Sequence, residues 1–288
     1  MSNTKSANFL FFGSSKFSVF CLEELKTLGL LPTAIITTPD MPTGRGLKLT
    51  PTPVKLWAQE NSIECLTPEK LSQDFALKLS TLDFSLFLVA SYGKIIPKNI
   101  LELPKHGTLN IHPSLLPKYR GSSPLQEQIL NDEKNIGVTI MLMDEKVDHG
   151  PIIAQEKVEI LNWPVKFDEL KMILAKVGAR LYANNLENWQ ADKIKPVEQK
   201  HTEATFTKKV EKVDGLIDIE TGASYKNFLK IQAYSTWPQA YFFVNKGEQK
   251  IRVIVKEANF KDGKLEITRV LPEGKKEMPY KDFLNGLK

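Results

Sequence analysis

One short stretch of the sequence carries two side chains suited to oxyanion stabilisation and proton transfer. Asn110 and His112 lie two positions apart in an apolar run that Pro113 ends. Residues two apart in a β-strand point to the same face, so we expect the amide and the imidazole to lie together. At a strand end, the amide could donate to a developing oxyanion while the ring moves a proton. Without further context, a hydrogen-bonded structural pair is the more common explanation of this pattern.

Asp148 is the third candidate for the same chemistry. It lies in the polar segment 144–150, 36 positions after His112 (148 minus 112), which is close enough for neighbouring strand ends to meet. A carboxylate beside an imidazole holds one tautomer of the ring and favours proton uptake. A turn aspartate before a glycine is the alternative. We read His149 as turn surface, and neither His106 nor His201 has a visible partner.

Several common catalytic motifs are absent from the sequence. Gly13 stands alone after the first apolar run, so a Gly-x-Gly-x-x-Gly dinucleotide fingerprint is missing. There is also no P-loop, no His-Glu-x-x-His and no Gly-x-Ser-x-Gly. Cys21 and Cys65 are 44 positions apart and have no companion ligands, so we expect both to be packing residues and we expect no metal.

The elements that must position these groups alternate between strand and helix. Apolar runs predict strands at 9–13, 34–38, 63–66, 84–90, 108–112, 137–143 and 152–160. Amphipathic spacing predicts helices at 16–28, 54–61, 71–82, 124–130 and 167–189. This alternation indicates an α/β fold with a mostly parallel sheet and helices on both faces. Because ligands bind outside the carboxyl ends of such strands, Gly13, Tyr92 and His112 should converge at one edge.

The last third of the chain has a different pattern. Residues 191–207 read as a linker, and short alternating strands follow at 215–219, 240–244, 250–255 and 264–270, with one helix at 224–233. We therefore predict a catalytic domain at 1–190 and a small β-barrel at 208–288. Residues 191–288 contain 19 Lys/Arg and 14 Asp/Glu, which accounts for the whole net charge of +5. This distribution fits a polyanion-facing appendage, although a lysine-rich solvated surface explains it equally well.

Composition excludes several protein classes. The chain has 288 residues, of which 42% are hydrophobic and 25% charged, as in ordinary globular proteins. Disordered, collagen-like and disulfide-stapled chains are therefore excluded. The longest apolar run, Phe84–Ala90, falls far short of the roughly 18 residues of a membrane helix. No signal peptide is visible and only two cysteines occur, so we expect a cytoplasmic protein.

Four short motifs together resemble a known family. Asn110-Ile-His112, Ser114-Leu-Leu-Pro117, Gly137-Val-Thr-Ile and Asp148-x-Gly150 are similar to the signature of the formyltransferases that use formyl-tetrahydrofolate. The likeness spans about residues 9–243, and the last 45 or so residues are too generic to compare. Pro113 and Ser122-Ser123 depart from the residues of many bacterial members, but neither change removes a reacting group.

Three further stretches resemble the members of this family that act on initiator methionyl-tRNA. They are the loop Thr38–Lys48 with Pro53-Val-Lys55, the segment Ala204-Thr-Phe to Gly215, and Ala233–Tyr241. The loop carries Gly44-Arg45-Gly46 and Lys48, which the resemblance places at the tRNA acceptor end. The Ser114–Gly121 segment is shared with sugar N-formyltransferases and does not discriminate between these members.

The resemblance implies a Rossmann-like domain followed by a C-terminal barrel of oligonucleotide-binding type. It implies transfer of a formyl group from 10-formyltetrahydrofolate to the α-amine of methionine on initiator tRNA, by a monomer without a metal. The catalytic residues would be Asn110, His112 and Asp148. The folate pocket would be formed by Ser114, Leu115, Leu116 and Pro117, with backbone groups of Ser91, Tyr92 and Gly93. Arg45 and Lys48 would contact the tRNA.

Other functions stay open at this point. A sugar-nucleotide N-formyltransferase would use the same triplet and folate, but it would not need the arginine–glycine loop or the basic C-terminal region. A purine-pathway formyltransferase is usually a single domain, so the final hundred residues argue against it. A non-enzymatic RNA-binding protein would explain the basic region but not the grouping of Asn110, His112 and Asp148. Folate binding would exclude this last alternative.

Overall fold

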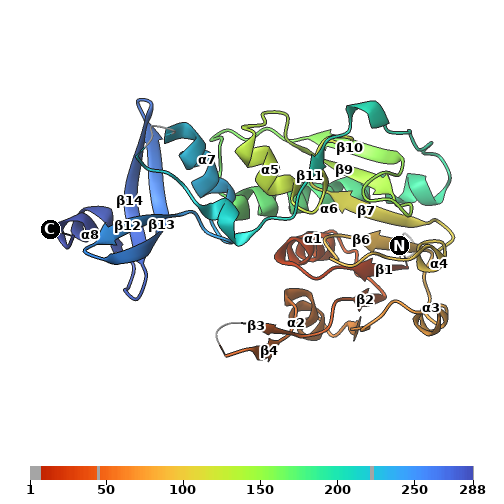
Figure 1. Cartoon of the computed structure of the whole chain (residues 1–288). Coiled ribbons are helices and arrows are strands. Elements are labelled where there is room, and N and C mark those ends of the chain that lie inside the picture. The colour runs from red at the N-terminus through yellow and green to blue at the C-terminus, as the bar shows by residue number, and fades with distance from the viewer. Residues whose placement is uncertain (1–7, 44–45, 221–223, 288) are drawn as a thin grey trace. The chain divides into compact units, whose positions relative to one another are not determined.

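The computed structural model describes residues 8–43, 46–220 and 224–287, which form two compact units (Figure 1). Unit 1 comprises the chain up to Arg120 together with Gly137–Val158 and Met172–Phe206. Unit 2 comprises Gly121–Ile136, Glu159–Lys171 and the chain from Thr207 onward. The limits expected from sequence, 1–190 and 208–288, stay a prediction about where the functional domains divide.

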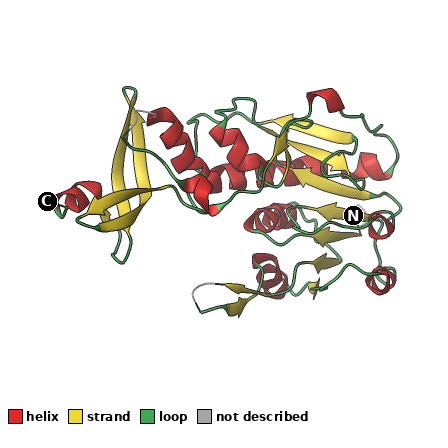
Figure 2. Ribbon diagram, viewed as in Figure 1, coloured by secondary structure: helices red, strands yellow, loops and turns green. Residues whose placement is uncertain are grey.

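Unit 1 is built on a seven-stranded sheet with the order β10-β9-β7-β6-β1-β2-β5 (Figure 2). Its strands are β1 (Phe9–Phe12), β2 (Ala34–Ile36), β5 (Glu64–Leu66), β6 (Leu86–Val89), β7 (Thr108–His112), β9 (Gly137–Leu142) and β10 (Ile152–Lys157). The five strands from β7 to β5 run parallel, whereas β9 pairs antiparallel with both β7 and β10. The expected mostly parallel, Rossmann-like sheet is therefore confirmed.

The first two helices begin after residues whose side chains satisfy a backbone N–H group of the first turn. Ser15 caps α1 (Lys16–Thr27) in a capping box with Ser18, and the Thr52 hydroxyl accepts from the third residue of α2 (Pro53–Glu60). The helices that follow in the chain are α3 (Gln73–Leu79), α4 (Lys98–Leu101), α5 (Pro124–Leu130) and α6 (Phe167–Gln190). The predicted helix at 124–130 agrees with α5 to the residue.

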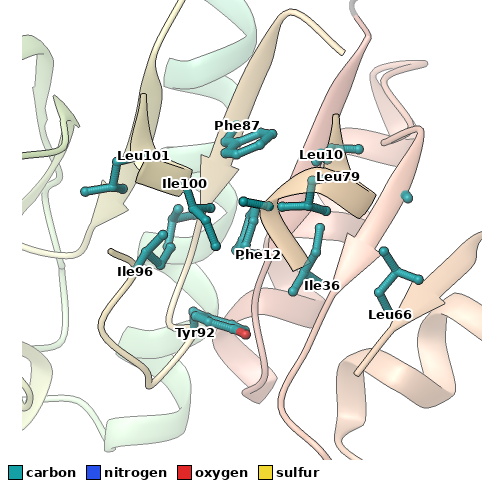
Figure 3. Close-up of a cluster of buried hydrophobic side chains, with 13 residues drawn as sticks. Leu10, Phe12, Ile36, Leu66, Leu79, Phe87, Tyr92, Ile96, Ile100 and Leu101 are labelled. Carbon is teal, nitrogen blue, oxygen red and sulfur yellow. The ribbon is translucent and has the colours of Figure 1, made fainter. Parts of the chain in front are cut away.

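Helices cover both faces of the sheet because alternate residues of β1 point to opposite sides. Leu10 and Phe12 pack in a cluster with Leu79 of α3 and Ile100 of α4 (Figure 3). On the other face, the ring of Phe9 lies 5.9 Å from that of Tyr182 in α6. The strand residues of β1 are fully buried, which explains why this strand reads as a continuous apolar run.

Unit 2 contains a four-stranded antiparallel sheet, β12-β13-β14-β15. Its strands are β12 (Tyr241–Lys246), β13 (Gln249–Lys261), β14 (Lys264–Pro272) and β15 (Met278–Pro279). Unit 2 also contains α5 together with α7 (Ser224–Ala233) and α8 (Tyr280–Asn285). Asp262 and Gly263 both have positive φ, as the tight turn between β13 and β14 requires. Gly247 and Gly274, at the turns before β13 and after β14, also have positive φ.

One expected strand of unit 2 is wrong. Residues 215–219 form no extended strand, because Lys212–Gly215 is a short 3-10 helix and only Leu216 bridges to Tyr241. A Cβ on Gly215 would lie 2.3 Å from the carbonyl oxygen of Gln239, so the backbone approaches its neighbour too closely for a regular strand with side chains. In addition, β13 is more than twice as long as its predicted counterpart.

The described chain also contains two short two-stranded sheets. β3 (Met41–Thr43) pairs with β4 (Lys48–Thr50), and β8 (Arg120–Gly121) pairs with β11 (Phe206–Thr207). Within the described ranges, no helix has the length and apolar character needed to cross a membrane.

Candidate active site

The carboxyl ends of β1, β6 and β7 meet at one edge of the sheet. The backbone N–H of Ser14 donates to the carbonyl of Ser91 at 3.1 Å, and the Ser14 hydroxyl donates to the carbonyl of Tyr92 at 3.0 Å. Val89 of β6 pairs with Asn110 of β7, so His112 lies beyond the last paired residue of β6. Parallel pairing therefore brings the expected segments together, as the α/β alternation predicts.

His112 and Asp148 form the centre of this edge. The Nδ1 atom of His112 lies 3.5 Å from Oδ1 of Asp148, and the two side chains are 4% and 14% exposed. The Nε2 atom lies 3.0 Å from the carbonyl oxygen of Tyr119. Both ring nitrogens thus face oxygen atoms, which come from two different segments of the chain.

Asn110 lies on the same face of β7 as His112. It is buried, with 9% of its surface exposed, and it pairs with Met141 of β9 on one side. The amide therefore lies two residues before the imidazole on the same face of the strand, and it is not on the protein surface. The grouping of Asn110, His112 and Asp148 that the motifs predict is present as geometry, and their catalytic roles stay proposals.

The Ser114–Pro117 segment is held by two strands that follow it in sequence. The Thr139 hydroxyl of β9 donates to the Ser114 carbonyl at 2.6 Å and accepts from the Leu116 N–H at 3.1 Å. Gln155 of β10 donates to the Leu116 carbonyl at 2.8 Å. The Leu115 side chain lies against Gly137, where an added Cβ would approach it to 2.5 Å. The Gly137-Val-Thr motif thus supports the segment that sequence reasoning assigns to folate.

The Ser91–Gly93 segment contributes backbone rather than side chains to this edge. The Tyr92 ring belongs to the buried core cluster and lies edge-on to Phe12 (Figure 3). Burial raises the pKa of the Tyr92 hydroxyl to about 12. Ser91 and Gly93 both have positive φ, and a Cβ on Gly93 would meet nothing within 4 Å. The loop is therefore sharply turned and open at Gly93.

The structure describes only one of the two residues expected to contact tRNA. Arg45 lies outside the described residues. Lys48 begins β4 and is exposed, next to Leu47 and Leu49, which are 72% and 65% exposed. The hairpin of β3 and β4 thus presents apolar side chains to solvent beside the lysine.

Sequence reasoning missed a set of buried polar groups behind the catalytic edge. Arg120 is 3% exposed, and Gln199 is 4% exposed although it lies in the expected linker. Burial lowers the pKa of the Arg120 guanidinium, an effect that Asp148 and Asp144 oppose. The Arg120-Gly121 pair at the end of the Ser114 motif was a visible signal, whereas Gln199 had none.

Two histidines to which the sequence analysis gave no role, His149 and His201, contact other side chains. Nδ1 of His149 lies 2.6 Å from Oδ2 of Asp144, and the His149 ring stacks on His201 with centroids 4.1 Å apart. Reading His149 as turn surface is therefore wrong, because the tertiary fold brings residue 201 against it. His106 lines a cavity of about 520 Å³ in unit 1, and none of the predicted site residues lines this cavity.

Among the residues that the structure describes, no group of three or more His, Cys, Asp or Glu could hold a metal ion.

Comparison with known proteins agrees with the geometry. Residues 5–186 match the family model for formyl transferases. The methionyl-tRNA formyltransferase of Thermotoga neapolitana is 41% identical over 244 residues, covering 84% of this chain and 77% of its own. That of Thermodesulfovibrio yellowstonii is 36% identical over 301 residues, covering 98% and 97%.

Solved structures share the fold at lower identity. The methionyl-tRNA formyltransferase of Clostridium thermocellum superposes with a TM-score of 0.61 at 17% identity, covering 92% of this chain and 98% of its own. HypX of Aquifex aeolicus, solved in complex with tetrahydrofolic acid, superposes with a TM-score of 0.67 at 18% identity, covering 98% of this chain and 48% of its own. The family match over most of unit 1 and the closer relatives lead to one conclusion: this chain belongs to the formyl transferase family of enzymes.

Proposed function

We propose that this protein transfers the formyl group of 10-formyltetrahydrofolate to the α-amine of methionine carried by initiator tRNA. The observation that carries the proposal is the His112–Asp148 pair, which lies with Asn110 at the carboxyl edge of the sheet. Relatives with 41% and 36% identity bear the name methionyl-tRNA formyltransferase, which supports the same acceptor. We place the reaction in the cytoplasm, where translation begins, and expect the enzyme to act as a monomer.

The residues at this edge suit the chemistry. Formyl-tetrahydrofolate, when bound, supplies a carbonyl carbon that the amine attacks, so negative charge develops on the formyl oxygen. The Asn110 amide can donate to that oxygen, and removing one such donor typically costs about 2.7–4 kcal/mol of barrier stabilisation. His112 can accept the proton that the amine loses and return it to the folate nitrogen as the bond from that nitrogen to the formyl carbon breaks. General acid–base catalysis of this kind is worth roughly 100- to 10,000-fold in rate. Asp148, 3.5 Å from Nδ1, holds the ring in one orientation.

The loops at this edge fit a flat, folate-like molecule. After β6, Gly93 has open space beside it, and the nearby Ile95 side chain is 84% exposed. Ser114–Pro117 follows the neighbouring strand β7 and is fixed by Thr139 and Gln155. A flat aromatic ring gains from apolar contact on its faces and from backbone groups at its rim. We therefore assign folate binding to Ser114–Pro117 and to the backbone of Ser91–Gly93.

Two features support an RNA substrate. All of the net positive charge lies in residues 191–288, which includes the sheet of unit 2. On that sheet, Nζ of the exposed Lys250 lies 4.5 Å from the ring centroid of Phe243, which is 40% exposed. Cations interleaved with aromatic rings are typical of surfaces that bind nucleic acid. We assign tRNA binding to this region, and contact with the acceptor end to Arg45 and Lys48.

One assay tests the proposal directly. Purified protein is mixed with 10-formyltetrahydrofolate and either charged initiator or charged elongator methionyl-tRNA, and formyl-methionine is measured. We expect rapid formylation of the initiator and much slower formylation of the elongator. If neither tRNA is formylated while a nucleotide-linked amino sugar is, the chain is a sugar-nucleotide N-formyltransferase and the acceptor is wrong.

A further inference from the structure

The segment that leaves α6 and leads into β11 runs back along unit 1 behind the catalytic edge. We name residues 191–206 the connector. Val197 forms a bridge with Ile152, the first residue of β10, through two backbone hydrogen bonds of 2.8 and 2.9 Å. The connector is therefore tied to the strand that follows the Asp148 loop (residues 143–151).

Gln199 of the connector holds the backbone of the Asp148 loop. Its side-chain nitrogen donates to the carbonyls of Asp148 at 3.0 Å and Gly150 at 2.7 Å. Its side-chain oxygen accepts from Nε and Nη2 of Arg120 at 3.1 and 2.6 Å. The nitrogen and the oxygen of this buried side-chain amide thus each make two hydrogen bonds. The backbone of Asp148 has a left-handed conformation with φ of 48°.

Thr205 of the connector holds the other neighbour of His112. The Thr205 hydroxyl accepts from the Tyr119 N–H at 2.8 Å, and the Thr205 backbone N–H donates to the Pro117 carbonyl at 3.3 Å. Tyr119 also has a left-handed backbone, with φ of 62°, and its carbonyl oxygen lies 3.0 Å from Nε2 of His112. The carbonyl of Thr205 accepts from the Arg120 N–H at 2.9 Å.

Arg120 and two histidines join these contacts. Nη2 of Arg120 donates to Nδ1 of His201 at 2.9 Å, so this ring carries its proton on Nε2 when neutral. His201 stacks on His149, which is bonded to Asp144 of the same loop. The connector therefore touches the Asp148 loop through a hydrogen-bonding side chain and through a stacked ring.

We infer that the connector is a positioning element for the catalytic pair: Gln199 and Thr205, joined by buried Arg120, fix the two oxygen acceptors that face the ring nitrogens of His112. This inference rests on the proposed function, because it assigns how the site of that reaction is held. Left-handed backbone at non-glycine residues is costly and persists only where surrounding contacts impose it. Loss of a connector contact should let Asp148 or Tyr119 relax, and a displacement of about 1 Å can cost on the order of 100-fold in rate.

The test separates positioning from folding with two variants at Gln199. Gln199→Glu keeps an oxygen acceptor for Arg120 but has no N–H to donate to the loop carbonyls. Gln199→Met removes both functions and leaves Arg120 without that acceptor. We expect both to lower kcat by about 10-fold or more with the KM for tRNA nearly unchanged, whereas only Gln199→Met should markedly lower the melting temperature.

Thr205 offers a rescue by a conservative change. Thr205→Val has nearly the same shape but no hydroxyl for the Tyr119 N–H, and Thr205→Ser restores it. We expect kcat to fall by about 3- to 10-fold in the valine variant and to return to within about 2-fold of wild type in the serine variant. Gln190→Met is the matched control, because Gln190 donates to Ser85 at the amino end of β6 and should leave kcat unchanged.

A double-mutant cycle decides whether Gln199 acts through Asp148. In an Asp148→Asn background, Gln199→Glu should cause little further loss, because the carboxylate that it positions is already gone. Fully multiplicative losses, or a kcat within about 2-fold of wild type in Gln199→Glu and Thr205→Val, would overturn the inference. Absence of formylation by the wild-type protein would instead refute the proposed function, so the two failures are distinguishable.

Discussion

The Nδ1 atom of His112 lies 3.5 Å from Oδ1 of Asp148, although the two residues are 36 positions apart and lie on different segments. The contact forms because β7 and β9 are neighbours in the sheet and the loop after β9 folds back toward the carboxyl end of β7.

Removal of either donor at the end of β7 should impair turnover rather than binding. We expect His112→Ala and Asn110→Ala to lower kcat by at least about 100-fold with tRNA affinity nearly unchanged, because both groups act on the transition state. Steady-state kinetics and a tRNA-binding assay check this. His106→Ala is the control, because His106 lies before β7 rather than at the end of this strand. A variant at position 110 or 112 that keeps more than about a third of wild-type turnover contradicts the assignment.

Asp148→Asn keeps the shape of the side chain but removes its charge. We expect a large fall in kcat and a displaced acid-side limb of the pH profile, because a neutral amide no longer holds the imidazole in the same proton state. Turnover measured across the pH range checks both effects. An unaltered rate and profile would reduce Asp148 to a turn residue before Gly150.

Gly150→Ala should disturb the Asp148 loop through a steric clash. A Cβ at this position would lie 2.0 Å from the carbonyl oxygen of Leu142, so the backbone must shift. Such overpacking costs typically 1–3 kcal/mol, and here the shift also moves Asp148, which should lower kcat. Chemical denaturation and kinetics measure the two effects. Gly286→Ala is the matched control, because its Cβ would lie an ordinary 3.6 Å from the nearest atom, the Phe283 carbonyl oxygen.

Arg45→Ala should lower the rate on initiator tRNA more than it lowers affinity, and it should narrow the difference between initiator and elongator tRNA. An arginine can contact a phosphate or a base edge with two parallel hydrogen bonds, so Arg45→Lys should not restore the rate. Rates on both tRNAs test this. Discrimination that stays intact in Arg45→Ala would contradict the role.

Lys250→Gln provides the comparison for Arg45, because Lys250 is exposed on the sheet of unit 2 beside Phe243. A phosphate contact there should contribute sequence-independent attraction, so its loss raises the KM for both tRNAs. The salt dependence of binding should become shallower by about 0.7–0.9 in log–log slope for one lost contact. If Arg45→Ala behaves in the same way as Lys250→Gln, the Arg45 loop and the sheet of unit 2 do not have separate roles in tRNA recognition.

The buried Tyr92 hydroxyl should make the protein sensitive to alkaline pH. Burial raises its pKa from 10.0 to about 12, so stability is full below pH about 10 and falls as the pH rises toward 12, where the unfolded state loses the proton more easily. In the described chain, no hydrogen-bond partner faces this hydroxyl. Tyr92→Phe should therefore not destabilise the protein at neutral pH, and it should lessen the alkaline loss. A drop in unfolding free energy of several kcal/mol at neutral pH would contradict this expectation.

Local patterns in the sequence determine the elements and the chemistry that the chain can offer. Continuous apolar runs such as Phe9–Phe12 indicate buried parallel strands, because both faces of such a strand are covered. The two-residue spacing of Asn110 and His112 indicates a shared face, and the order of strands and helices indicates which strand ends meet. These inferences succeed because they depend on contacts between residues near one another in sequence or on a regular topology.

Only the tertiary structure decides how the site is held. Residues 191–206 lack periodicity, so the sequence predicts a linker, yet Gln199 and Thr205 bond to Asp148, Gly150 and Tyr119. Each of these pairs is separated by about 50 to 86 positions, and polar side chains of this kind are common in loops. Whether such a side chain is solvated or buried depends on which distant carbonyls the fold leaves without a partner, and no local pattern records that.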